Sequence, residues 1–211
     1  MALDSVMAAE IFKRSFEDMR RQMNEVKAEL GQIVLVGVID PLKGIQEPVR
    51  GMAAITLVDP PPDAELRGLA MKVWMDALDA KFGGLMMEVW ISMNPTPVPG
   101  GGIRRASQDP ERTSALVGIF FDTEAKTTMA WNAAINDDTR EVADAELIPG
   151  GPGTTFGGAI PDVVFGLIPP PTEFPDAESA EKFLTFLAEA GEVKEQMEQM
   201  IQNGEVGHDG P

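Results

Sequence analysis

The sequence contains no cysteine and only one histidine, His208, in a chain of 211 residues. Without cysteine the chain can form no disulfide, no thiolate nucleophile and no zinc–thiolate site. A single histidine three residues from the end excludes a Ser-His-Asp triad or a site of several histidines within one chain. The candidate groups that remain are carboxylates and arginines, and we expect no bound cofactor.

Basic residues are scarce. The chain has 17 Lys and Arg against 34 Asp and Glu, which gives a formal net charge of −17. This balance argues against binding to the phosphates of nucleic acids. The excess is concentrated near the C-terminus, where residues 173–211 carry ten acidic and two basic residues. An acidic protein that mimics nucleic acid is therefore one hypothesis for the function, although acids and bases intermix in the first two-thirds of the chain.

Long hydrophobic runs are also missing. Residues 147–161, one of the two longest stretches without charge, are interrupted by glycine and proline and are unsuited to span a membrane. Asp4 and Glu10 interrupt the N-terminal region where the apolar core of a signal peptide would lie. The composition, 44% hydrophobic and 24% charged, is that of a globular protein. We therefore expect a soluble, cytoplasmic protein with no membrane partner.

Residues 4–30 have the pattern of an amphipathic helix. Apolar residues recur at spacings of three and four, which places them on one face of the helix. Gly31 provides a stop. The helix needs a partner surface, either in its own domain or in another subunit, and we consider it a candidate interaction helix. The side chains proposed for this contact are Phe12, Phe16, Met19, Met23, Val26 and Leu30.

The central part of the chain alternates between patterns of strands and a helix. The predicted strands cover residues 32–39, 52–58, 85–93, 114–121 and 127–135. A helix is predicted over residues 63–82, with Gly83 and Gly84 as its left-handed exit. The order strand, helix, strand suggests a parallel crossover. We therefore predict an α+β fold with a mixed five-stranded sheet in the order β-β-α-β-β-β, flanked by N- and C-terminal helices.

The remaining sequence suggests a division of the chain into segments. An arm rich in Gly and Pro (residues 149–175) carries large apolar groups and is expected to lie extended against a surface of this chain or of a neighbour. An acidic helix follows, with an interruption at Gly191. The predicted segments are the N-terminal helix (1–31), the α+β core (32–148), the arm (149–175), the acidic helix (176–204) and a tail (205–211).

Two stretches are candidates for ligand binding. The long polar loop over residues 94–113 holds glycines beside arginines, and such a loop can direct backbone N–H groups and guanidinium groups at an anion. The candidate anion-binding residues are Gly100, Gly101, Gly102, Arg104 and Arg105. A group of acidic residues between positions 137 and 146 has the composition of a calcium site or an acid/base pair, or of an ordinary solvated surface.

A resemblance to known proteins rests on three short segments, namely residues 88–90 (EVW), 105–112 (RASQDPER) and 115–116 (AL). They resemble a pattern found in small uncharacterised bacterial and phage proteins, in which E-A-W lies on a strand and R-P-S-x-D-P-x-R precedes the next strand. Val89 replaces the usual Ala and Ala106 the usual Pro. The resemblance implies an architecture but no activity.

A structural role is available for the charged residues of this pattern. Carboxylates and guanidinium groups can form bidentate pairs, which would hold the long loop across the sheet. The residues of this predicted clasp are Glu88, Arg105, Asp109 and Arg112.

The sequence leaves three functions open. The first is a non-enzymatic assembly or interaction protein with protein partners, as a homo-oligomer or part of a larger assembly; if the chain is phage-encoded, its location would be the virion. The second is a carboxylate-based, metal-assisted hydrolase that uses Glu88 with Asp109 or with the acidic group. The third is the acidic mimic of nucleic acid. We favour the first, because no nucleophile–base pair is visible.

Overall fold

The computed structural model describes residues 4–30, 32–39, 51–58, 60, 63–91, 112–148, 159–169, 171, 173–174 and 176–202. Within these ranges the chain forms four helices and six strands. They are α1 (Ser5–Val26), β1 (Gln32–Ile39), β2 (Gly51–Val58), α2 (Ala64–Ala77), β3 (Phe82–Ile91), β4 (Thr113–Asp122), β5 (Thr127–Ile135), β6 (Glu146–Leu147), α3 (Ala159–Val164) and α4 (Ala177–Gln202).

The strands form one sheet in the order β2-β1-β3-β4-β5-β6. The α+β fold is confirmed, with two corrections. Each neighbouring pair is antiparallel, so the sheet is not mixed. Strands β2 and β3 do run in the same direction around α2, but β1 lies between them. The sixth strand, β6, has two residues, too few for an alternating pattern to reveal it.

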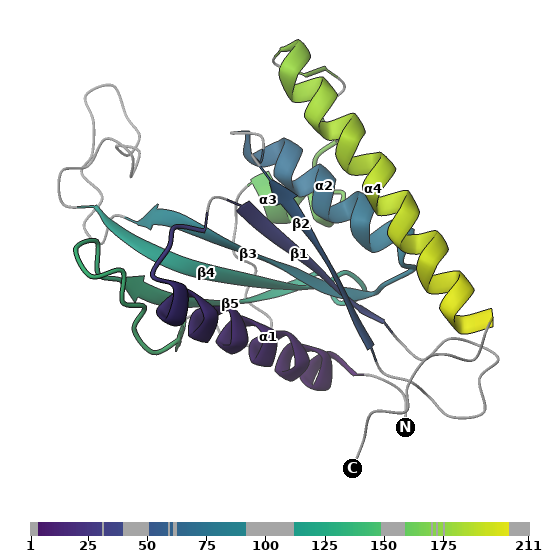
Figure 1. The fold of residues 1–211 in the computed structure, drawn as a ribbon. Helices are drawn as coiled ribbons and strands as arrows, with labels where there is room; N and C mark the ends of the chain where they lie inside the picture. The colour runs from purple at the N-terminus through teal and green to yellow at the C-terminus, as the bar shows by residue number, and fades with distance from the viewer. Residues whose placement is uncertain are drawn as a thin grey trace.

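The helices cover both faces of the sheet. Helix α1 packs on one face, and α2, α3 and α4 pack on the opposite face (Figure 1). Side chains alternate between the two faces along each strand. In β3, for example, Met86 contacts the cluster around α1, whereas Leu85 and Met87 contact the cluster around α2. Both faces of the sheet are therefore covered over its central strands, which are correspondingly apolar.

The apolar face of α1 packs against the sheet of its own chain. Phe12 and Phe16 are fully buried and Met23 is 6% exposed. For these side chains the partner surface therefore lies in the same domain, which was the first of the two alternatives. The helix ends at Val26, earlier than predicted, because Lys27 adopts a left-handed conformation (φ 57°). Val26, the last residue of the helix, is 70% exposed.

Gly83 and Gly84 lie inside β3, so the prediction that they form the exit of the preceding helix was wrong. Helix α2 ends at Ala77, and the left-handed residue after it is Asp79 (φ 50°). The two glycines are explained by close packing from both faces. A Cβ atom on Gly83 would lie 2.8 Å from Met71 Cε, and one on Gly84 would lie 2.7 Å from Phe12 Cζ.

The C-terminal part of the chain differs from the sequence prediction in two places. Part of the predicted extended arm is the short helix α3, which packs against α2 so closely that a Cβ on Gly68 would lie 2.9 Å from the Ile160 carbonyl oxygen. Helix α4 continues through Gly191 without the predicted interruption. One side of α4 is buried, and its buried side chains are those of Phe183, Phe186 and Ala190. The predicted tail lies outside the described residues.

None of the helices described here combines the length and apolar character needed to cross a membrane.

Candidate functional site

The carboxylate of Glu88 is the centre of a charged contact at one end of the sheet. Arg140 Nη2 donates hydrogen bonds to Glu88 Oε1 at 2.9 Å and to Oε2 at 2.8 Å. The backbone N–H of Leu30 also donates to Oε2, at 2.9 Å. The side chains of Glu88 and Arg140 are only 15% and 16% exposed. Glu88 therefore ties β3 both to the segment after α1 and to the turn after β5.

Arg140 is positioned by a tight turn that begins at Asn136. The Asn136 side-chain oxygen accepts hydrogen bonds from the backbone N–H groups of Asp138 and Thr139, each at 3.0 Å. Arg140 itself adopts a left-handed conformation (φ 58°), which is uncommon for a residue other than glycine. Hydrogen bonding to Glu88 raises the pKa of Arg140, an effect that burial partly opposes. The guanidinium group therefore stays charged and paired.

The predicted clasp is described only in part. Arg105 and Asp109 lie outside the described residues. Arg112 lies over the ring of Trp90, with its guanidinium carbon 4.4 Å from the ring centroid. Arg140, which no sequence pattern predicted as part of this contact, pairs with Glu88. The positions are 52 residues apart, so no local spacing connects them.

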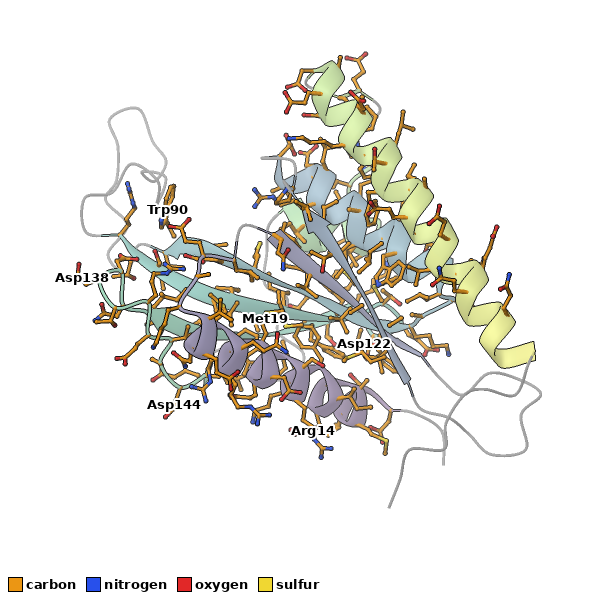
Figure 2. All side chains as sticks on the ribbon, in the orientation of Figure 1. Arg14, Met19, Trp90, Asp122, Asp138 and Asp144 are labelled. Atoms are coloured by element: carbon orange, nitrogen blue, oxygen red, sulfur yellow. The ribbon has the colours of Figure 1, made fainter. Side chains whose placement is uncertain are left out.

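A hollow of about 860 Å³ adjoins the Glu88–Arg140 pair. Its charged lining is balanced, with three carboxylates and three guanidinium groups. Trp90 on its wall is 52% exposed, and Figure 2 shows it at the end of the sheet that also carries Asp138. Burial lowers the pKa of Arg67, and the charge of Asp63 opposes that change. The charged residues that line the hollow are Glu29, Glu88, Asp137, Arg67, Arg112 and Arg140.

The acidic residues between positions 137 and 146 do not converge. No group of three possible metal ligands occurs in the part of the chain that the structure describes. Glu141 instead pairs with Lys27 at 3.7 Å, and Asp144, which Figure 2 shows beside α1, pairs with Arg20 at 3.2 Å. Two hydrogen bonds between the Asn24 side chain of α1 and the Val142 backbone, at 3.0 and 2.8 Å, hold the segment after β5 against α1. The candidate anion loop (residues 100–105) lies outside the described residues.

A second concave surface, which we call the β2–α4 groove, runs between strand β2 and helix α4. The strand contributes Thr56, Leu57 and Val58. The helix contributes three glutamates and one lysine, and this lysine pairs with one of the glutamates at 3.0 Å. No sequence pattern predicts this groove, because it is formed by segments more than a hundred residues apart. The residues of α4 that line it are Glu178, Glu181, Lys182, Thr185, Phe186 and Glu189.

Strand β2 is also an edge of the sheet. It pairs with β1 over all eight of its residues, and no described residue pairs with its other side. At the opposite edge, the outermost strand β6 has only two residues, and a single bridge between Ile135 and Val142 lies beside it. Short or interrupted strands are a common protection of sheet edges. The β2 edge lacks this protection.

Comparison of the chain with protein-family models, with curated proteins and with solved structures gives no significant match in any of the three.

Proposed function

We propose that the protein acts by binding other protein chains, without catalysing a reaction, and that strand β2 is its main binding element. The observation that carries this proposal is the edge of β2, with which no residue of the described part of the chain pairs, beside the β2–α4 groove. In a strand, alternate residues direct their N–H and C=O groups away from the paired neighbour. A strand of eight residues with one open side therefore offers a row of backbone donors and acceptors to an incoming chain.

The composition of β2 is that of an edge strand that pairs with another chain. Proteins usually protect long edge strands with charged side chains, proline or bulges. The sequence of β2, GMAAITLV, contains neither proline nor a charged residue, and its pairing with β1 is regular throughout. Val58 and Met52 are 69% and 41% exposed. An unprotected, apolar edge of this length is a hazard for aggregation unless a partner covers it.

The hydrogen bonds of the Glu88 carboxylate argue against the hydrolase hypothesis. A general acid or base must be able to exchange a proton with a substrate. Both oxygens of Glu88 accept hydrogen bonds from Arg140, and one also accepts from Leu30 N–H. A paired carboxylate of this kind is suited to hold elements together. A protein that mimics nucleic acid needs a surface of uniform negative charge. Helix α1 does not provide one, because Arg20 and Arg21 pair with its acidic residues.

Site-specific photo-crosslinking in the producing cells tests the proposal. A photoreactive phenylalanine derivative at Val58 would lie at the exposed end of β2, and the same residue at Asp138 is the control, because Asp138 lies far from α4 (Figure 2). We expect one discrete protein adduct from position 58 and none from position 138. The purified partner should then bind the parent protein and should bind the Ala54→Lys variant about tenfold more weakly. The absence of a position-specific adduct would contradict the proposal.

A further inference from the structure

We infer that the β2–α4 groove takes one class of partner, an extended segment of another protein that carries Lys or Arg at every second position. This inference rests on the proposed function, and it adds the chemistry of the occupant. Three features of the described residues lead to it, namely the open backbone of β2, the acidic face of α4 and the apolar opposite face of β2.

The first step is the geometry of an added strand. A segment that pairs with the open side of β2 would extend the sheet, and its side chains would alternate between the two faces. One set would point to the face that carries α4, where Leu57 of β2 already lines the groove with the helix. The other set would point to the face that carries α1 (Figure 1).

The second step is the charge of α4 along the groove. Glu178, Glu181 and Glu189 line it, and their spacings of three and eight residues place them on one side of the helix. All three are exposed. Lys182 is the one basic residue among the described groove residues, and it already pairs with Glu178. The net negative charge favours basic side chains at the positions of the segment that face α4.

The third step concerns the opposite face of β2. Met52, Ala54 and Val58 are exposed there, because α1 packs over β1, β3 and β4 and leaves the edge strand largely uncovered. Side chains of the added strand that point to this face would lie beside these apolar groups. Apolar or β-branched residues are therefore expected at the alternate positions of the segment, where cross-strand pairs of such residues stabilise a sheet.

A second copy of this chain is a poorer occupant. Strand β2 has no charged residue to place against the glutamates of α4. Pairing of two β2 edges would also bring together two chains that each carry a net charge of −17. Like charges at an interface oppose association. The charges therefore favour a basic partner over self-association.

Synthetic peptides test the inference. The probe is a fluorescent, end-capped peptide of about eight residues in which Lys alternates with Val or Thr, a length that matches β2. Its affinity for the full chain is measured by fluorescence anisotropy at about 0.05 M salt. Two matched peptides replace Lys by Gln or by Glu, and a third keeps Lys but carries N-methyl groups on alternate amides. We expect the basic peptide to bind at least about tenfold more tightly than any of the three.

Protein variants locate the binding. Glu181→Lys should weaken binding of the basic peptide about tenfold, whereas Asp138→Lys, the same charge change at an exposed position far from α4, should leave it unchanged (Figure 2). Equal binding of the Gln peptide would overturn the basic specificity. Equal binding of the N-methylated peptide, or equal effects of the two variants, would overturn strand addition in this groove.

The failure of the inference can be distinguished from the failure of the proposed function. If no peptide binds but Val58 crosslinks to a different protein, the protein-binding function stands and the basic occupant is wrong. If Val58 crosslinks only to a second copy of this chain, the occupant is again wrong. If the peptides fail and position 58 gives no adduct, both proposals fall.

Discussion

Glu88 is an acidic residue at a strand position where most glutamates would be unfavourable. Burial of an isolated carboxylate is costly unless hydrogen bonds and a counter-charge replace water. Arg140 and the Leu30 N–H supply both, and the pair is about 85% buried. Because the three groups come from distant parts of the chain, the contact fixes the end of β3 relative to α1 and the turn after β5.

The first prediction concerns this pair. Arg140→Ala would leave the Glu88 carboxylate without its counter-ion, and we expect the free energy of unfolding to fall by about 1–3 kcal/mol. The control is Arg21→Ala. Arg21 pairs with Asp18 on α1, but both side chains are more than half exposed, so the loss should be below about 1 kcal/mol. Urea unfolding measures both, and equal losses would show that the Glu88 contact is not structural.

At the scale of elements, α1 is a structural helix on the side that faces the sheet. Gly84 and Gly118 allow Phe12 and Phe16 to lie directly on the strands, since a Cβ at Gly118 would lie 3.0 Å from Phe16 Cε2. Helix, glycines and strands are therefore matched to one another. The exposed side of α1 carries mostly charged residues, among them Arg14, which Figure 2 shows pointing away from the sheet.

The second prediction follows from this packing. Phe16→Ala should lower the free energy of unfolding by about 3–5 kcal/mol, because it removes a fully buried aromatic side chain. Val26→Ala, on the same predicted apolar face but 70% exposed, should change it by less than about 0.5 kcal/mol. Unfolding monitored by circular dichroism gives both values. A stable Phe16→Ala variant that has lost only its ability to associate would instead support a role of this face between subunits.

The third prediction concerns the start of α4. Asp176 accepts a hydrogen bond from the Ser179 N–H at 2.7 Å, and this bond lowers the pKa of Asp176 below its ordinary value of 3.8. The folded state therefore gains stability from the ionised group above the ordinary pKa, and the gain is lost as the pH falls through the lowered pKa.

Asp176→Asn tests this dependence, because asparagine also caps helices but does not titrate. We expect the melting temperature of the parent protein to fall more steeply than that of the variant between about pH 5 and pH 2. Parallel curves for the two proteins would show that the charge of Asp176 does not stabilise α4.

The elements also show which parts of the fold are readable from sequence. Residues 32–39 were predicted with the correct bounds, because an unbroken β-branched run specifies a buried strand without further context. Gly83 and Gly84 were misplaced, because a glycine pair after a helical pattern usually marks a helix end, whereas here it serves close packing from Met71 and Phe12. Local patterns decide the type of an element, and long-range packing decides where it begins.

The candidate site was less predictable for the same reason. Glu88 was predicted as part of the clasp because its carboxylate could pair with a guanidinium group. Its partner, Arg140, carries no local signal of its function, because it lies in a polar turn among acidic residues. The β2–α4 groove depends on the order of strands in the sheet, which places β2 at an edge. Sequence alone predicted the sheet as mixed, so it could not identify that edge.

At the scale of the whole molecule, the two edges of the sheet and the distribution of charge both favour β2 as the binding element. One edge ends in the short strand β6, and the other ends in the unprotected strand β2 next to a helix with an acidic face. The central claim is that the open side of β2 is free to pair with another chain.

Residue-resolved hydrogen–deuterium exchange on the isolated protein tests this claim most directly. Strand β1 lies between two neighbours and should be protected along its length. In Gly51–Val58 the account predicts a period of two, in which amides bonded to β1 are slow and the intervening amides exchange roughly a hundredfold faster. Uniform protection of all eight residues of β2, at the level of β1, would mean that its open side is already occupied and would contradict the account.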